Sequence, residues 1–349
     1  MHLAPAGDRL EDDGAGARAR GILADAVALD RAGRSRRAEV ALAEAAEMGR
    51  LVGDRLIESE AHRRLAVIRH HAGDRVDAGR HGNAALAAAR AAADPAAEAH
   101  CLNVLGGIAL ELGDLEEARA AFVAARHLAV PDALIGRIEQ NLGIVADVAG
   151  DSAAALQHYG CALRAFGRAG DDHGVAIAHH NLGKLSFTRG EFGLAERYFD
   201  RALGAAVRVG DLRLEGLCHL NRAEARLSQG RPEAAWDDVE RAQALFSQLG
   251  SLVEEAEVYR LFGAVFRHLG RDGTAEANLL AACEHARRTG AVLTEAASHR
   301  ELARLRLDQG RTTEAVEAYR RAGTLFDRIG ARGEGAEIDA CLATVGASP

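Results

Sequence analysis

The chain has 349 residues, of which 48% are hydrophobic but only 4% aromatic, a balance that favours closely packed helices over a thick β-sandwich. Its formal net charge of −8 argues against a general binder of nucleic acids or anionic membranes, because such proteins are usually basic. The five cysteines are widely spaced and form no CxxC pair, which argues against a disulfide framework or a zinc site and indicates a reducing compartment.

The N-terminal segment, residues 1–17, is polar and rich in glycine and alanine, so we expect it to be disordered. It lacks the basic stretch and apolar run of a signal peptide, and the sequence contains no uninterrupted apolar stretch of about 18 residues. We therefore expect a cytoplasmic protein without a transmembrane helix. Lys184 is the only lysine beside many arginines, a bias that suggests a high-GC bacterial genome.

From residue 18 to 330 the chain is divided by turn signals at a regular interval. Glycines in similar contexts, such as AGDR and LGDL, follow one another in steps of 40, 40, 37, 40, 40, 40 and 40 residues. We call them the turn glycines: Gly33, Gly73, Gly113, Gly150, Gly190, Gly230, Gly270 and Gly310. A second break, often Gly-Asp, lies about twenty residues after each of them. Since the segments between the breaks have helical periodicity, the pattern predicts eight helix–turn–helix repeats.

Small residues recur at fixed places in every repeat. Alanine stands five and twelve residues after each of the eight turn glycines, so these two positions share one face of the second helix. The residue seven before the turn glycine is always alanine or glycine, whereas the residue nine after it is often aromatic or aliphatic. Small side chains let neighbouring helices approach closely, and a larger one would overpack the contact at a cost of about 1–3 kcal/mol.

This alternation of small and large positions resembles the tetratricopeptide-repeat (TPR) family over roughly residues 18–330. The forty-residue period, with Asn-Leu-Gly before two of the turns, is similar to the extended-helix subgroup that includes kinesin light chains, the spindle adaptor LGN and bacterial regulators. The chain departs from the commonest TPR in lacking the proline that often ends the second helix. The resemblance implies an all-α, right-handed superhelical solenoid whose first helices line a concave groove, where ligands usually lie.

Two segments differ from the regular repeat. Repeat three is three residues shorter than the others around Leu128–Pro131, which predicts a shortened helix or a tightened loop. Residues 331–349 include an amphipathic stretch with Ile338, Leu342 and Val345 on its apolar face. This stretch predicts a helix that caps the exposed end of the stack, followed by a short tail.

Asparagine recurs nine residues before the turn glycine in three successive repeats, as Asn141, Asn181 and Asn221. Asparagine is a mediocre helix former, so helix stability does not explain its recurrence. An amide both donates and accepts hydrogen bonds, so a row of asparagines could hold an extended peptide backbone, as in similar members of the family. The alternative is that each asparagine bonds to a neighbouring repeat and fixes the stack.

Charged side chains complete the candidate groove. The further candidate binding residues are His180, Lys184, Arg260, Arg267, Arg300 and Arg304. The arginines could receive acidic side chains or a terminal carboxylate through forked hydrogen bonds. Because Glu257, Glu301 and Asp308 lie near them in the sequence, an ordinary solvated charged face is the alternative.

The sequence contains none of the common catalytic or metal-binding patterns. We find no GxxxxGK[ST] phosphate loop, HExxH motif, GxSxG elbow or zinc-finger spacing. Four histidines, His62, His179, His219 and His299, share the position eleven before the turn glycine, which packs between helices in such repeats. We interpret them as structural or half-buried, and we expect no enzymatic activity, no metal and no cofactor.

The sequence therefore predicts a scaffold or adaptor that binds an extended peptide or partner segment in its concave groove, in bacterial signalling or regulation. One alternative is a sensor that binds a short signalling peptide and changes its superhelical pitch. Another is a self-assembling structural protein or a non-catalytic enzyme subunit. We expect a protein or peptide partner rather than nucleic acid or a membrane, and a monomer or weak self-association.

Overall fold

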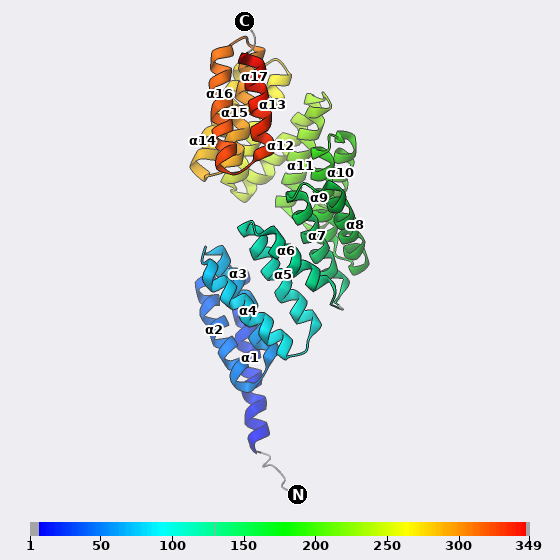
Figure 1. Ribbon diagram of the computed structural model, residues 1–349, viewed down its shortest axis with the longest axis vertical. Helices are drawn as coiled ribbons and strands as arrows, with labels where there is room; N and C mark the ends of the chain where they lie inside the picture. Colours follow the sequence, from blue (N-terminus) through cyan, green and yellow to red (C-terminus); the bar gives the residue numbers. More distant parts are fainter. Residues whose placement is uncertain (1–6, 129, 347–349) are drawn as a thin grey trace. The chain divides into compact units, whose positions relative to one another are not determined.

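The structure is a computed structural model that describes residues 7–128 and 130–346, and within these residues it contains 17 helices and no strand (Figure 1). The helices are α1 (Gly7–Arg31), α2 (Ser35–Val52), α3 (Arg55–His71), α4 (Arg75–Ala91), α5 (Pro95–Leu112), α6 (Leu115–Arg126), α7 (Asp132–Val148), α8 (Ser152–Ala169), α9 (Asp172–Thr188), α10 (Phe192–Val209), α11 (Leu212–Ser228), α12 (Pro232–Leu249), α13 (Leu252–His268), α14 (Asp272–Thr289), α15 (Val292–Asp308), α16 (Thr312–Arg328) and α17 (Arg332–Gly346). The first sixteen form the eight predicted helix–turn–helix pairs, so the all-α repeat fold is confirmed.

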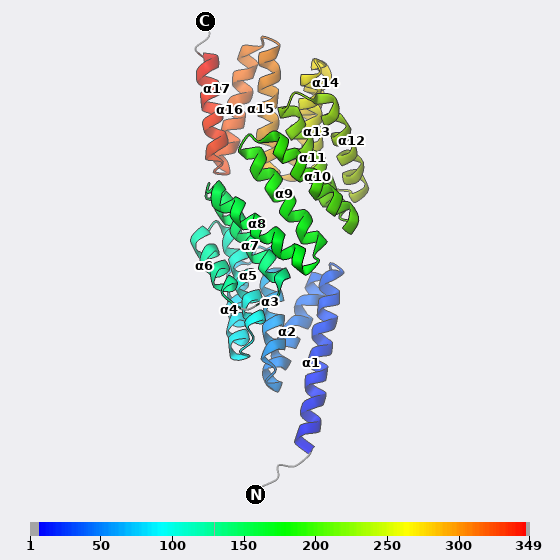
Figure 2. The ribbon, with the colours of Figure 1, turned by 90° about the vertical axis from the view of Figure 1, so that its right-hand side faces the viewer.

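Contacts within the chain divide it into two units, one ending at Gly174 and the other beginning at Val175, so the boundary falls inside α9. From α1 to α8 and from α10 to α17, each helix packs against its neighbours in the sequence (Figure 2). First helices of successive repeats also touch, as α3 and α5 do in unit 1 and α13 and α15 do in unit 2. This nearest-neighbour packing is the organisation of a helical solenoid.

The turn glycines have the backbone conformation that their sequence context predicts. All eight have positive φ angles, between 68° and 84°, where a residue with a side chain is strained. The second series of breaks also uses glycine with positive φ in six places. Between α4 and α5, however, Ala93 takes that place with a φ of 53°, the only non-glycine residue with positive φ in the described part of the chain.

Replacing Ala93 with glycine is therefore expected to stabilise the protein by about 0.5–1 kcal/mol. Relief of the left-handed strain, about 1–2 kcal/mol for a residue with a side chain, outweighs the larger entropy that glycine has in the unfolded chain. Urea unfolding of the two proteins measures the difference. Ala92→Gly is the matched control, because Ala92 has a φ of −75° and its replacement should give no gain in stability. Equal effects of the two substitutions would contradict this account.

The small positions of the repeat lie where the helices approach most closely. All sixteen alanines five and twelve residues after the turn glycines are 0% exposed. A Cβ atom on Gly143 would lie 2.5 Å from the ring of Tyr159, and one on Gly183 would lie 2.5 Å from the ring of Phe199. The first helix therefore lacks a side chain where the second helix places a large one against its backbone.

The N-terminal expectation was wrong for residues 7–17, because α1 begins at Gly7. This segment continues the first repeat helix, which is anchored by the buried Ala19 and Ala26. Extending an existing helix avoids the cost of nucleation, so even a polar segment with several glycines can stay helical. Residues 1–6 lie outside the described part of the chain.

The two irregular segments behave as predicted. The second helix of repeat three, α6, has 12 residues, whereas α8 and α10 each have 18. Ala129, in the short connection that follows, lies outside the described residues. The predicted C-terminal helix is present as α17, which packs against α16 and buries Ile338 completely.

Candidate functional site

The three predicted asparagines lie on the first helices α7, α9 and α11, and all three are half-buried. In unit 1, the Asn141 amide donates a hydrogen bond to Oδ1 of Asn103 on α5 at 3.0 Å. In unit 2, Nδ2 of Asn221 lies 2.7 Å from Nε2 of His180 on α9. These contacts join successive repeats, so for Asn141 and Asn221 they favour the alternative in which the amides fix the stack. Each amide has a second N–H, and a binding role for the row, including Asn181, stays a prediction.

The two other predicted residues on α9 differ in their surroundings. Burial, together with the charge of Lys184, lowers the pKa of His180 to about 4. His180 is therefore neutral at pH 7, and its Nε2 atom accepts the N–H of Asn221. Lys184 is exposed.

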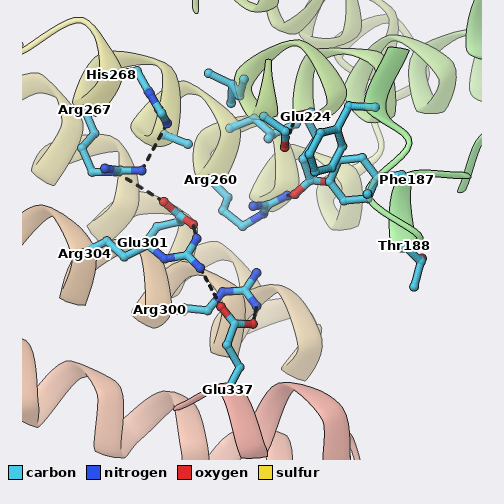
Figure 3. Close-up of a pocket in the computed structure, with 16 residues that line it drawn as sticks. Phe187, Thr188, Glu224, Arg260, Arg267, His268, Arg300, Glu301, Arg304 and Glu337 are labelled. Atoms are coloured by element: carbon cyan, nitrogen blue, oxygen red, sulfur yellow. Dashed lines mark hydrogen bonds and ion pairs between the residues drawn. The ribbon is translucent and has the colours of Figure 1, made fainter. Parts of the chain in front are cut away.

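The four predicted arginines come together in unit 2, where they line a pocket of about 590 Å³ (Figure 3). Arg260 and Arg267 extend from α13, and Arg300 and Arg304 extend from α15. Figure 3 shows them gathered around acidic side chains, one of which, Glu337, comes from α17. The positions that the sequence indicated as groove-facing are thus brought to one place.

The same pocket has an apolar part, contributed by α9, α10 and α11. Phe187 and Phe192 lie with their ring centroids 5.3 Å apart, and Leu227 lines the pocket beside them. Leu261 and Ala264 of α13 continue this apolar lining toward the arginines. The pocket therefore offers apolar surface next to a cluster of charges.

Arg260 is the most deeply buried of the four arginines, with 5% of its surface exposed. Its guanidinium donates to Glu224 of α11 at 2.8 Å and, from Nε, to Glu257 at 2.9 Å. Burial alone would lower the pKa of Arg260, but Glu257 and Glu224 hold it well above its usual value. Arg260 is thus charged and already paired with acidic residues of the chain. This agrees with the alternative of an ordinary charged face, but Arg260 is buried, whereas that alternative assumed a solvated surface.

Glu301 is the buried anion at the centre of the charged cluster, with 5% of its surface exposed. Arg304 donates to it at 2.6 Å, and Nε of Arg267 lies 3.5 Å from its carboxylate. Burial acts to raise the pKa of Glu301, but the charges of Arg304 and Arg267 outweigh it and lower the pKa. Arg267 also pairs with Asp308 at 2.9 Å. The repeats themselves therefore neutralise Arg260 and Arg267.

Glu337 differs from the other carboxylates of the pocket. It accepts hydrogen bonds from Arg300 at 3.2 Å and from Arg304 at 2.7 Å, while 44% of its side chain is exposed. Even with Glu337 in place, Nε of Arg300 is buried without a hydrogen-bond partner. Among the three carboxylates that line the pocket, the one that Arg300 and Arg304 share is therefore the most accessible to solvent.

Sequence reasoning missed Glu224, Phe192 and Glu337 as parts of this pocket. Glu224 occupies on α11 the position six before the turn glycine, which Lys184 and Arg304 share, so this common offset could have found it. No repeat position predicts Glu337, because it lies outside the repeats on α17.

The histidines eleven residues before the turn glycines are buried or half-buried, as expected. His219 and His299 are 8% and 7% exposed, and His62 and His179 are half-buried. Among the residues that the structure describes, no three His, Cys, Asp or Glu side chains are grouped so that they could hold a metal ion. In the same part of the chain, no helix combines the length and the apolar character that crossing a membrane requires.

The comparisons with known proteins concern both sequence and fold. Residues 134–206 match the family model for the tetratricopeptide repeat, whereas no curated protein matches the sequence. The apo form of RapI has a similar structure, with a TM-score of 0.65 and 12% identity over 94% of this chain and 97% of RapI. A Rap protein complexed with competence and sporulation factor has a TM-score of 0.60 and 10% identity, over 95% of this chain and 98% of that one.

A third similar structure is a tetratricopeptide repeat protein from Parabacteroides merdae, with a TM-score of 0.54 and 18% identity over 80% of this chain and 98% of that one. At such identities the likeness concerns the fold alone. The family match covers two of the central repeats, and the eight helix pairs carry the same pattern of small and large positions. The chain is thus a helical-repeat protein whose residues 134–206 match the tetratricopeptide-repeat family.

Proposed function

We propose that the chain is a non-catalytic interaction scaffold that binds an extended segment of a partner protein along the first helices of unit 2. The observation that carries this proposal is the pocket of about 590 Å³, in which aromatic and aliphatic side chains adjoin four arginines. Aromatic residues and arginine are the side chains that most often dominate the energy of protein interfaces. TPR solenoids as a class support such a role, because their stacked first helices form extended binding surfaces.

The proposed binding surface continues onto α9. Lys184 occupies the same place in its repeat as Glu224 and Arg304, both of which line the pocket, and its side chain is exposed. Asn181 lies one turn before Lys184 on the same helix and is half-buried. We propose that these side chains contact the backbone or the acidic groups of the bound segment.

The five free cysteines support a reducing, cytoplasmic location for this activity. As a second candidate function we propose a regulator that responds to a small signalling factor. The observation in its favour is the likeness to the Rap protein complexed with competence and sporulation factor, which is a likeness of fold.

The test is selection of peptides from a library of random twelve-residue sequences on the full chain, followed by affinity measurements with variants. Arg304→Ala and Phe192→Ala, at the charged and apolar parts of the pocket, should each weaken the selected peptides roughly tenfold or more, the loss of about 1.4 kcal/mol. The matched controls are Arg241→Ala and Leu280→Ala, which change exposed side chains on the second helices α12 and α14.

These controls should leave the affinity unchanged. Selected peptides that bind pocket variants and control variants equally well, or the absence of any selected peptide, would contradict the proposal.

A further inference from the structure

We propose that Glu337 occupies the place of an acidic residue of the ligand, so that the bound segment carries a carboxylate that displaces Glu337 from Arg300 and Arg304. The inference rests on the proposed function. It adds that the ligand is acidic and that Glu337 competes with it for the two arginines. Three carboxylates meet in the pocket, those of Glu224, Glu301 and Glu337 (Figure 3).

Two of these carboxylates belong to the repeats, and one does not. Glu224 and Glu301 stand on the first helices α11 and α15, where each pairs with an arginine of the repeats. Glu337 stands on α17, which follows the last repeat, and its carboxylate reaches back to two arginines of α15. Glu337 thus brings an anion to the repeats from outside them, as the carboxylate of a bound ligand would.

The exposure of the three carboxylates supports this distinction. The side chain of Glu301 is 6% exposed and that of Glu224 is 31% exposed, whereas 44% of the Glu337 side chain is accessible. Exposed ion pairs contribute little to stability, because water and salt compensate for their loss. Glu337 can therefore leave the arginines without uncovering the core, since α17 is held through Ile338, which is completely buried.

The arginines keep their place when Glu337 moves away. Arg304 remains paired with Glu301 at 2.6 Å, and the guanidinium of Arg300 lies over the ring of Phe326, 5.8 Å from its centroid. Nε of Arg300 is buried and has no acceptor even while Glu337 is present. A preorganised guanidinium pair with an unused donor favours a carboxylate, which accepts two hydrogen bonds from arginine in parallel.

The charge of the pocket points to the same ligand class. Arg260 and Arg267 are already neutralised by acidic residues of the repeats. Among the described residues, withdrawal of Glu337 therefore leaves Arg300 and Arg304 with Glu301 as the one acidic side chain that pairs with either of them. An acidic group then restores the balance, whereas a neutral or basic group does not. Because Leu227 and the two phenylalanines adjoin the charged cluster, the ligand should pair its carboxylate with a nearby apolar side chain.

The carboxylate can come from an aspartate or glutamate side chain or from a chain terminus. The experiment therefore uses two libraries of random twelve-residue peptides, one with free and one with amidated C-termini, selected on the full chain. Affinities of the selected peptides are then measured for the unmodified protein, for Glu337→Gln and for Asp339→Asn. Asp339 is the matched control, because it is an exposed acid on the same helix that does not line the pocket.

If a side chain supplies the carboxylate, acidic residues should be enriched among the peptides selected from the amidated library. If only the library with free C-termini yields binding peptides, the carboxylate comes from the chain terminus. In either case Glu337→Gln should bind the selected peptides roughly tenfold more tightly, because the competitor is gone, and Asp339→Asn should not. Replacing the acidic peptide residue by its amide, or blocking the terminus, should abolish this gain.

The inference is wrong if the peptides require Arg304 and Phe192 but bind Glu337→Gln and Asp339→Asn with equal affinity, or show no need for a carboxylate. Peptides that are indifferent to Arg304→Ala and Phe192→Ala would instead contradict the proposed function itself. The two failures are thus distinguishable within one set of measurements.

Discussion

Asp238→Ala is expected to destabilise unit 2 by about 3 kcal/mol. Asp238 lies on α12 and is 2% exposed, and it accepts hydrogen bonds from His219 at 2.8 Å, from Arg222 at 2.5 Å and from Arg226 at 2.8 Å. Removing one member of a buried ion pair costs about 3–5 kcal/mol, because the partner is left charged and poorly solvated. The lower value applies here, since Arg222 keeps a pairing with Asp200.

The measurement is urea unfolding followed through Trp236, the only tryptophan of the chain, which lies against Phe262 and Phe266 in unit 2. Asp237→Ala is the matched control, because the neighbouring Asp237 is exposed and its loss should change stability by less than about 0.5 kcal/mol. Similar destabilisation by the two substitutions would show that the buried network contributes nothing of its own.

The loss of stability caused by Asp238→Ala should depend on pH. Burial acts to raise the pKa of Asp238, but hydrogen bonds from His219 and Arg222 outweigh it and hold the pKa below its usual value. A carboxylate whose pKa is lowered by folding stabilises the protein above its unfolded pKa, and this stabilisation is lost as the pH falls through the folded pKa. The stability difference between the unmodified protein and Asp238→Ala should therefore be constant from pH 7 to pH 5 and shrink below about pH 4.

The helix pairs and their packing positions could be predicted because their causes are local and are repeated eight times. A turn glycine ends each first helix, and fixed alanines bring the helices together, so each copy confirms the others. The extension of α1 to Gly7 was missed, because its composition alone does not show that it continues a helix anchored elsewhere. The division at Gly174 was also missed, since α9 has no irregularity in its sequence there.

The partners of the candidate residues were harder to predict, because they depend on the register between repeats. Asn103 stands ten rather than nine residues before its turn glycine, so the asparagine row did not indicate that it pairs with Asn141. The histidine contacts had a usable signal that was overlooked. His219 contacts Asp238, which lies 19 residues later in the chain. Glu139 contacts His158 across the same spacing, but there the acid comes first and the histidine second.

Glu301→Gln is expected to cost about 3 kcal/mol of unit 2 stability, whereas Glu337→Gln should cost at most about 1 kcal/mol. Both carboxylates accept a hydrogen bond from Arg304, at 2.6 Å and 2.7 Å, so they have the same chemistry and share one partner. They differ in burial, since 6% of the Glu301 side chain is exposed and 44% of the Glu337 side chain. Glutamine preserves the shape of the side chain but removes its charge. Arg267 and Arg304 then lose the buried anion that lies between them.

Urea unfolding followed through Trp236 measures both variants under the same conditions, and each serves as the control for the other. Added salt should distinguish the stability costs of the two substitutions further, because screening weakens an exposed ion pair much more than a buried one. Raising the salt concentration should remove the small effect of Glu337→Gln and leave most of the effect of Glu301→Gln. Equal costs for the two variants would mean that Glu337 belongs to the buried network, and an acidic ligand could then not replace it without unfolding that end of the pocket.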